Sequence, residues 1–145
     1  MTARLVSVQL EGVRTPVSRA RLSAAVAAVL RAERAGPALV SVTLVTRRRI
    51  TAMNRRHLGH AGPTDVISFT FRDPAGAVIG DVYICPEVAA ANARHFGRPV
   101  REELVRLVVH GTLHVLGHDH PDGEAREGAP MWRRQEQLVR RVLAG

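Results

Sequence analysis

The sequence predicts a single α+β domain in which a mixed sheet of about four strands is flanked by about five helices. Short alternating or β-branched stretches indicate strands at 5–10, 39–45, 64–71 and 78–84. The first two strands enclose a helical stretch, which is typical of a parallel βαβ unit. The last two are separated by the turn residues Asp73-Pro74-Ala75-Gly76, which predict an antiparallel hairpin.

The predicted helices follow from their end signals as much as from their apolar stripes. Ser18 and Thr46 are suitable N-cap residues, Pro86 suits a first helical turn, and Gly97 suits a helix end. The expected helices span 19–33, 47–57, 86–95, 101–116 and a last segment that ends near residue 143. Gly80 lies inside the fourth strand, where a glycine indicates either a bulge or the close approach of another backbone.

Length and composition suit one domain, residues 1–145, because the chain has 145 residues and is 46% apolar. No apolar run reaches the roughly 18 residues of a membrane span, and the first residues alternate like a strand rather than forming a signal-peptide block. We therefore expect a cytoplasmic protein with no membrane partner. Cys85 is the single cysteine, which excludes an intrachain disulfide and a cysteine-based zinc cluster.

All 21 basic residues are arginines, and they outnumber the 13 acidic residues, so the formal net charge is +8. A GC-rich genome would explain the missing lysines but not the excess of positive charge, which favours a nucleic-acid partner. Aromatic residues make up only 3% of the chain, so arginine contacts to phosphate are expected rather than base stacking. One arginine cluster is either a solvated helix face or a phosphate-binding patch: Arg47, Arg48, Arg49, Arg55 and Arg56.

Four of the seven histidines lie between His110 and His120, at the end of a strongly apolar stretch. In a helix, His110 and His114 share one face because they are four residues apart, so both imidazoles can reach one metal ion. Gly117 suits the left-handed position just after the helix, and the resulting turn brings His120 back as a third ligand. Three protein ligands leave one tetrahedral position open, as in catalytic zinc sites, and a structural zinc is the alternative.

The spacing His-x3-His-x5-His is shared with a class of zinc peptidases, whose general base is a glutamate directly after the first histidine. Gly111 occupies that position, so a peptidase of this type is not expected. His118 is expected beside the turn, where it would face either a metal ligand or the substrate. Asp119 either orients a ligand imidazole or caps the turn, and the sequence favours neither.

Five parts of the chain carry a family resemblance: the stretch 110–120, the segment Pro63-Thr64-Asp65-Val66-Ile67-Ser68-Phe69, the segment Gly80-Asp81-Val82-Tyr83-Ile84, the approach 103–109, and Met131 with Glu136. In this order and spacing they resemble the motifs of the YbeY family of bacterial endoribonucleases and rRNA maturation factors. Each motif alone is weak, whereas together they cover most of the chain and are specific.

The resemblance implies one Zn²⁺ per chain, held by His110, His114 and His120 in a single YbeY-like metal-dependent hydrolase domain. It implies a single-strand-specific endoribonuclease that matures the 3′ end of 16S rRNA and takes part in ribosome quality control. The implied partners are ribosomal RNA and the small ribosomal subunit or its proteins, in the cytoplasm, and no DNA partner is expected. The alternatives are a ribosome-associated assembly factor with zinc but little activity, and a zinc hydrolase of another substrate.

In such an enzyme, zinc would lower the pKa of bound water toward about 7 for attack on phosphorus. Activation of a ribose 2′-OH, or stabilisation of the leaving oxygen, is an open alternative. The expected catalytic residues are His114, Arg55, Arg56 and His118. The arginines, with Arg72 as a further candidate, would neutralise phosphate charge. The candidates for a general base are His118, Asp65 and Asp81.

Two positions depart from the family pattern. Leu58 stands where family members commonly have an arginine that is important for activity. Arg55 or Arg56, about one helical turn earlier, would then supply the charge. His118 stands where many members have a tyrosine, another bulky polar ring.

Overall fold

The computed structural model describes residues 3–120 and 128–145. Within these residues the chain forms, in order, β1 (Arg4–Leu10), α1 (Arg19–Ala32), β2 (Ala38–Leu44), α2 (Arg47–Leu58), β3 (Val66–Arg72), β4 (Val78–Ile84), α3 (Pro86–Phe96), α4 (Val100–Val115) and α5 (Pro130–Ala144). The predicted α+β class, with four strands and five helices, is confirmed. Each predicted boundary lies within two residues of the observed one.

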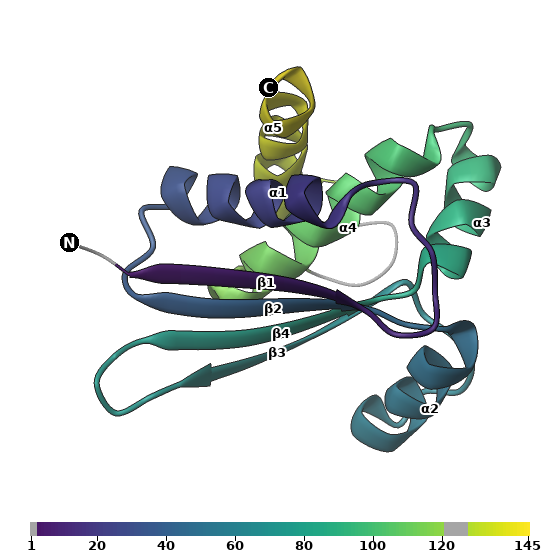
Figure 1. The fold of residues 1–145 in the computed structure, drawn as a ribbon, viewed down its shortest axis with the longest axis horizontal. Helices are drawn as coiled ribbons and strands as arrows, with labels where there is room; N and C mark the ends of the chain where they lie inside the picture. The colour runs from purple at the N-terminus through teal and green to yellow at the C-terminus, as the bar shows by residue number, and fades with distance from the viewer. Residues whose placement is uncertain (1–2, 121–127) are drawn as a thin grey trace.

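The four strands form one mixed sheet in the order β1-β2-β4-β3 (Figure 1). β1 and β2 are parallel and joined through α1, as the βαβ pattern predicts, and β4 is parallel to β2. β3 and β4 form the predicted antiparallel hairpin, whose turn is closed by Asp73: its carboxylate accepts hydrogen bonds from the backbone of Ala75 and Ala77. The register across β4 is continuous, so Gly80 does not mark a bulge.

The helices are divided unequally between the two faces of the sheet. Figure 1 shows α1 and α4 over one face, with α5 behind them, while α2 lies on the other side of the sheet. Side chains of α2 pack with Ile67 and Tyr83, which are register partners on the face turned away from α4. The rest of that face is open, and an apolar row crosses it at Leu5, Leu39, Ile79 and Phe71, of which all but the half-buried Ile79 are exposed.

The central element is α4, which is buried along most of its 16 residues. It packs against β3 and β4 below and against α1, α3 and α5 on its other sides. A helix enclosed in this way has to be apolar around most of its circumference, which explains the run Leu104 to Val109. Within residues 3–120 and 128–145, no helix is both long and apolar enough to cross a membrane.

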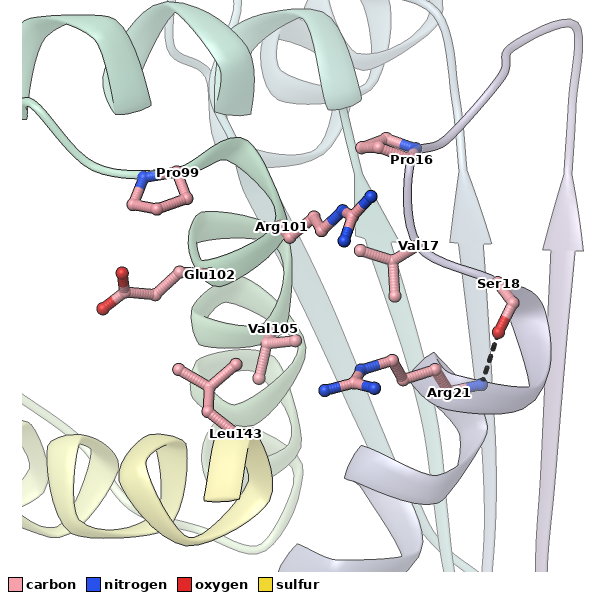
Figure 2. A pocket seen from close by; sticks show the side chains of 9 residues that line it. All are labelled: Pro16, Val17, Ser18, Arg21, Pro99, Arg101, Glu102, Val105 and Leu143. Carbon is pink, nitrogen blue, oxygen red and sulfur yellow. Dashed lines mark hydrogen bonds between the residues drawn. The ribbon is translucent and has the colours of Figure 1, made fainter. Parts of the chain in front are cut away.

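The N-terminal end of α4 borders a groove of about 340 Å³, which lies between the start of α1 and the end of α5 (Figure 2). Ser18 caps α1 at its rim, as predicted, by accepting a hydrogen bond from the backbone N–H of Arg21 at 3.1 Å. Glu102 lines the groove from the first turn of α4. His110 follows eight residues later, about 12 Å along the helix axis, so the groove is separate from the histidines.

α4 approaches β4 so closely that each element needs a glycine where it meets the other. A Cβ on Gly111 would lie 2.5 Å from Cγ1 of Val82, and a Cβ on Gly80 would lie 2.4 Å from Cγ1 of Val115. Both valines are buried in the core and cannot move aside without cost. Of the two readings that the sequence allowed for Gly80, the close approach is therefore correct.

Gly111→Ala is expected to lower the free energy of unfolding by about 1–3 kcal/mol, because the new methyl group overpacks the contact with Val82. Alanine is the better helix former by about 1 kcal/mol, so the same substitution at a roomy site would be stabilising. Urea unfolding should therefore show that Gly111→Ala lowers the free energy of unfolding when it is made in the wild-type chain. The same substitution made in the Val82→Ala variant should not lower it. Gly36→Ala, where nothing lies within 4 Å, is the control. A Gly111→Ala variant as stable as the wild type would contradict the close approach.

Candidate metal centre

His110 and His114 lie on one face of the last two turns of α4, as their spacing predicts. Their ring centroids are 4.6 Å apart. His110 is only 4% exposed because α5 covers it, whereas His114 is half-buried near the end of the helix. Both imidazoles are therefore carried by the buried central helix of the fold.

The end of α4 turns the chain back toward these two rings. Gly117 has a φ of 99°, which favours glycine, and its N–H donates to the carbonyl of His114 at 3.0 Å. The N–H of His118 donates to the carbonyl of Leu113, also at 3.0 Å, which completes a Schellman motif. After this turn the ring of His120 lies 5.1 Å from that of His110 and 5.0 Å from that of His114.

The three histidines each offer a ring nitrogen, and these nitrogens lie within 4.8 Å of one another. For His110 and His114, a hydrogen bond at Nδ1 indicates which ring nitrogen is left to bind a metal ion. Nδ1 of His114 lies 2.9 Å from the carbonyl oxygen of His118, and Nδ1 of His110 lies 2.6 Å from Oε1 of Gln135. Because both oxygens accept hydrogen bonds, a neutral ring carries its proton on Nδ1 and leaves Nε2 for a metal ion. This arrangement fits a divalent ion that binds neutral imidazole.

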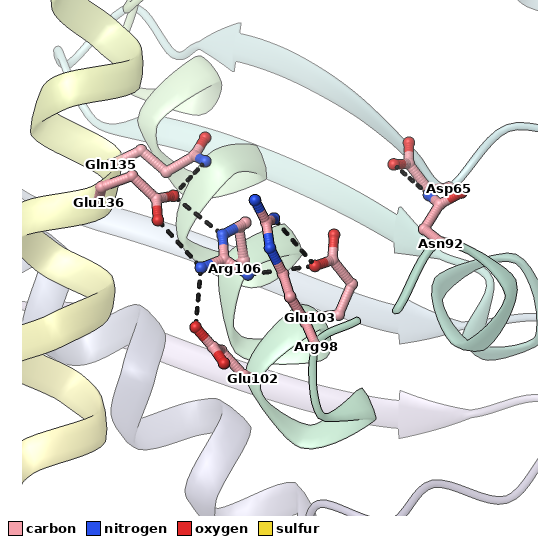
Figure 3. A network of polar contacts seen from close by, with 8 residues as sticks. All are labelled: Asp65, Asn92, Arg98, Glu102, Glu103, Arg106, Gln135 and Glu136. Atoms are coloured by element: carbon pink, nitrogen blue, oxygen red, sulfur yellow. Dashed lines mark hydrogen bonds and ion pairs between the residues drawn. The ribbon is translucent and has the colours of Figure 1, made fainter. Parts of the chain in front are cut away.

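Gln135, the hydrogen-bond partner of His110, is joined to an ion-pair network that Figure 3 shows. Gln135 donates through Nε2 to Glu136 at 3.0 Å, and Glu136 accepts two hydrogen bonds of 2.9 Å from Arg106 on α4. Arg106 also donates to Glu102 and Glu103, at 3.0 and 3.1 Å. The network therefore joins the histidine cluster to the interface between α4 and α5.

Arg106 and Glu136 stabilise each other's charged form. Burial by itself raises the pKa of Glu136, but hydrogen bonds from Arg106 and Gln135 and the positive charge of Arg106 outweigh burial and lower that pKa. Burial likewise opposes the charged form of Arg106, yet its hydrogen bonds with Glu136 and Glu102 raise its pKa. Glu136 is therefore a carboxylate at neutral pH, and it can only accept hydrogen bonds.

Comparison with known proteins places the chain in a family. The family model described as endoribonuclease YbeY matches residues 9–143. The chain belongs to the YbeY family. The endoribonuclease YbeY of Anaeromyxobacter dehalogenans is 44% identical over 122 residues, which cover 83% of this chain and 62% of that protein. The endoribonuclease YbeY of Frankia casuarinae is 38% identical over 136 residues, which cover 85% of this chain and 67% of that protein.

A solved structure shares the fold of this chain. The solution structure of TM1509 from Thermotoga maritima superposes with a TM-score of 0.62 at 27% identity, over 97% of this chain and 90% of that one. The chain spans about two thirds of the length of the curated YbeY relatives that it matches.

The structure brings the backbone of His118, rather than its ring, to the cluster. The ring Nε2 of His118 lies 2.5 Å from Glu33, directly after α1, and Glu33 also binds Arg134 of α5 at 2.9 Å. The same ring lines a hollow of about 230 Å³ together with Arg72. Asp119 caps the turn, because its carboxylate accepts from the backbone N–H of His120 at 2.8 Å. A general-base role for His118 stays a prediction.

The two aspartates considered as bases have other surroundings. Asp65 accepts a hydrogen bond of 3.2 Å from Asn92 of α3. Asp81 precedes Val82, whose side chain meets Gly111, so Asp81 points to the face of the sheet that is turned away from α4. Asp81 is therefore not part of the histidine cluster.

Arg55 and Arg56 lie in the last turn of α2 and are exposed, as is Leu58, the final residue of the helix. Figure 1 places α2 across the sheet from α4, so the arginines and the histidine cluster belong to different parts of the molecule. The catalytic role of these arginines stays a prediction.

Gln135 is the residue of this site that the sequence analysis missed. It is 1% exposed and follows Met131 by four residues, on the buried face of α5. A glutamine inside an apolar helical stripe is a detectable signal, because a buried amide has to find hydrogen-bond partners.

Glu136→Gln is expected to destabilise the chain at neutral pH and to cost less as the pH falls. The pKa of Glu136 is lower in the folded chain than the unfolded value of about 4.3, so its charge contributes stability above that value and loses it below. Urea unfolding of both proteins from about pH 7 down to about pH 3 should show the two stabilities converging. Glu87→Gln, at an exposed position of α3, is the control. A stability difference independent of pH would contradict the ion-pair assignment.

Proposed function

We propose that the chain is a zinc-dependent endoribonuclease that cuts single-stranded RNA, with residues 1–145 acting as one metal-dependent hydrolase domain. The observation that carries this proposal is the cluster of three histidines, in a chain whose YbeY relatives are named endoribonucleases. A peptidase of the same histidine spacing needs a glutamate at position 111. Gly111 packs against Val82, so the fold has no room for that glutamate.

The donor set supports zinc as the metal, one ion per chain, held by His110, His114 and His120. Three neutral imidazoles and an open fourth position are typical of catalytic zinc. When bound, zinc lowers the pKa of water and polarises a phosphoryl oxygen. The protein contributes the orientation of the rings, since the partners of His110 and His114 keep a proton on each Nδ1.

In addition to the metal ligand His114, the proposal includes three catalytic residues: Arg55, Arg56 and His118. The two arginines would bind RNA phosphates, which suits their exposure and the net charge of +8. His118 would contact substrate or transfer a proton from the hollow it shares with Arg72. Its ring is held in place by the contact with Glu33.

We further propose that the substrate is ribosomal RNA, with maturation of the 16S rRNA 3′ end and ribosome quality control as the roles, in the cytoplasm. The small ribosomal subunit or one of its proteins would be the partner. The exposed apolar row on the open face of the sheet supports a protein partner, because an apolar patch of this kind is typical of interaction sites.

One observation favours a second candidate function, a ribosome-associated assembly factor with little catalytic activity. Leu58 is an exposed leucine at the end of α2 where an arginine is expected. An apolar side chain cannot neutralise phosphate charge in the transition state.

His114→Ala is expected to abolish stoichiometric zinc binding and RNA cleavage, because only two imidazoles remain in the cluster. The purified wild-type chain should carry about one zinc per molecule, as measured by elemental analysis, and should cut a labelled single-stranded RNA. His95→Ala removes an exposed histidine of α3 and serves as the control that keeps both properties. A wild-type chain that holds no metal after incubation with Zn²⁺ would refute the metal centre.

The enzyme and the assembly factor are separated by rescue of a bacterial strain that lacks its own YbeY gene. For an enzyme, wild type restores the mature 16S rRNA 3′ end and His114→Ala does not, and Leu58→Arg raises the cleavage rate of the purified protein. We expect this outcome. Full rescue by His114→Ala, measured by mapping the rRNA 3′ ends, would establish the assembly-factor role instead.

A further inference from the structure

We infer that Gln135 is a positioning residue that holds His110 in the tautomer with the proton on Nδ1, and that the Glu136–Arg106 pair fixes Gln135 in the orientation that does so. The inference rests on the proposed function only in taking His110 as a metal ligand. Gln135 itself need not touch metal or substrate.

The first step is the burial of the Gln135 amide. Its side chain lies in an otherwise apolar part of α5, between Met131 and Leu138, and is 1% exposed. A buried amide without hydrogen bonds is unfavourable, so such a group persists where both of its ends are bonded. Here Oε1 meets His110 at 2.6 Å and Nε2 meets Glu136 at 3.0 Å.

The second step is the orientation of that amide. Glu136 is held as a carboxylate by two 2.9 Å hydrogen bonds from Arg106, so it accepts and does not donate. A flipped Gln135 would place its oxygen against the oxygen of Glu136 and lose a charge-assisted hydrogen bond. The amide nitrogen is therefore directed to Glu136, and the amide oxygen is directed to His110.

The third step is the effect on His110. A carbonyl oxygen 2.6 Å from Nδ1 stabilises the tautomer that carries a proton there, which leaves Nε2 able to bind a metal. With the opposite tautomer, Nε2 would have to lose a proton before it could bind. His114 achieves the same result through a backbone carbonyl, whereas the tautomer of His110 depends on a side chain that a substitution can change.

Gln135→Met tests the inference, because methionine has a similar length and no strong acceptor. In metal-free protein above about pH 8, long-range ¹H–¹⁵N correlation spectra should show the His110 proton on Nδ1 in the wild type and largely on Nε2 in the variant. The dissociation constant for Zn²⁺, from competition with a coloured chelator, should rise by about 10–100-fold.

Two variants separate positioning from a structural role. Gln137→Met makes the same change at an exposed site on the same helix and should leave both readouts at wild-type values. Gln135→Glu keeps an acceptor facing His110 but places two carboxyl groups side by side. It should lower stability while keeping the Nδ1 tautomer and a dissociation constant within about threefold of the wild type.

The inference is overturned if Gln135→Met leaves either the His110 tautomer or the zinc affinity unchanged, or if Gln135→Glu weakens zinc binding as much as Gln135→Met does. A wild-type chain that binds no zinc would refute the proposed function instead. The tautomer comparison in metal-free protein would still decide whether Gln135 controls His110.

Discussion

The contact between α4 and β4 is the constraint on which the rest of the structure depends. Gly111 meets Val82 and Gly80 meets Val115, so the central helix lies directly on the sheet. That depth lets α1, α3 and α5 surround the helix and bury His110 while its C-terminal turn stays accessible for His120. It also leaves no room after the first histidine for the glutamate of a peptidase with the same histidine spacing, because Gly111 faces the sheet.

Burying a helix this completely leaves its polar residues to find partners inside the protein. Arg106 is 5% exposed and binds Glu136 of α5 through two hydrogen bonds, and Gln135 continues the chain of contacts to His110. Buried ion pairs of this kind contribute little net stability, because desolvation offsets most of their attraction. In this protein the ion pair instead fixes an orientation. The carboxylate of Glu136 can only accept hydrogen bonds, so it orients the amide of Gln135, and that amide in turn sets the tautomer of His110.

The two features that suit an RNA hydrolase lie on different elements. The histidine cluster belongs to α4, which is surrounded by the core, and to the partly exposed turn after it. The exposed arginines belong to α2, which packs on the other face of the sheet through the cluster around Ile50 and Ile67. A long, flexible polyanion can contact both regions, whereas a compact substrate can contact only one. Membership of the YbeY family agrees with the former.

The sequence by itself determined the helices and strands, the hairpin, the family and the grouping of the three histidines, because each depends on local spacing. Apolar residues recur with a period of two in strands and 3.6 in helices. Two of the histidines are four residues apart, and a glycine stands where the chain turns back after the helix. Two matters were decided only by tertiary structure. Local pattern allowed Gly80 to be a bulge or a close approach, and the packing of Val115 against it settled the matter. Gln135 lies 25 residues from His110 in the chain, so nothing local connects them. Only the packing of α5 on α4 brings that amide to the ring, because hydrogen bonds between helices depend on where the helices lie and not on the spacing within either.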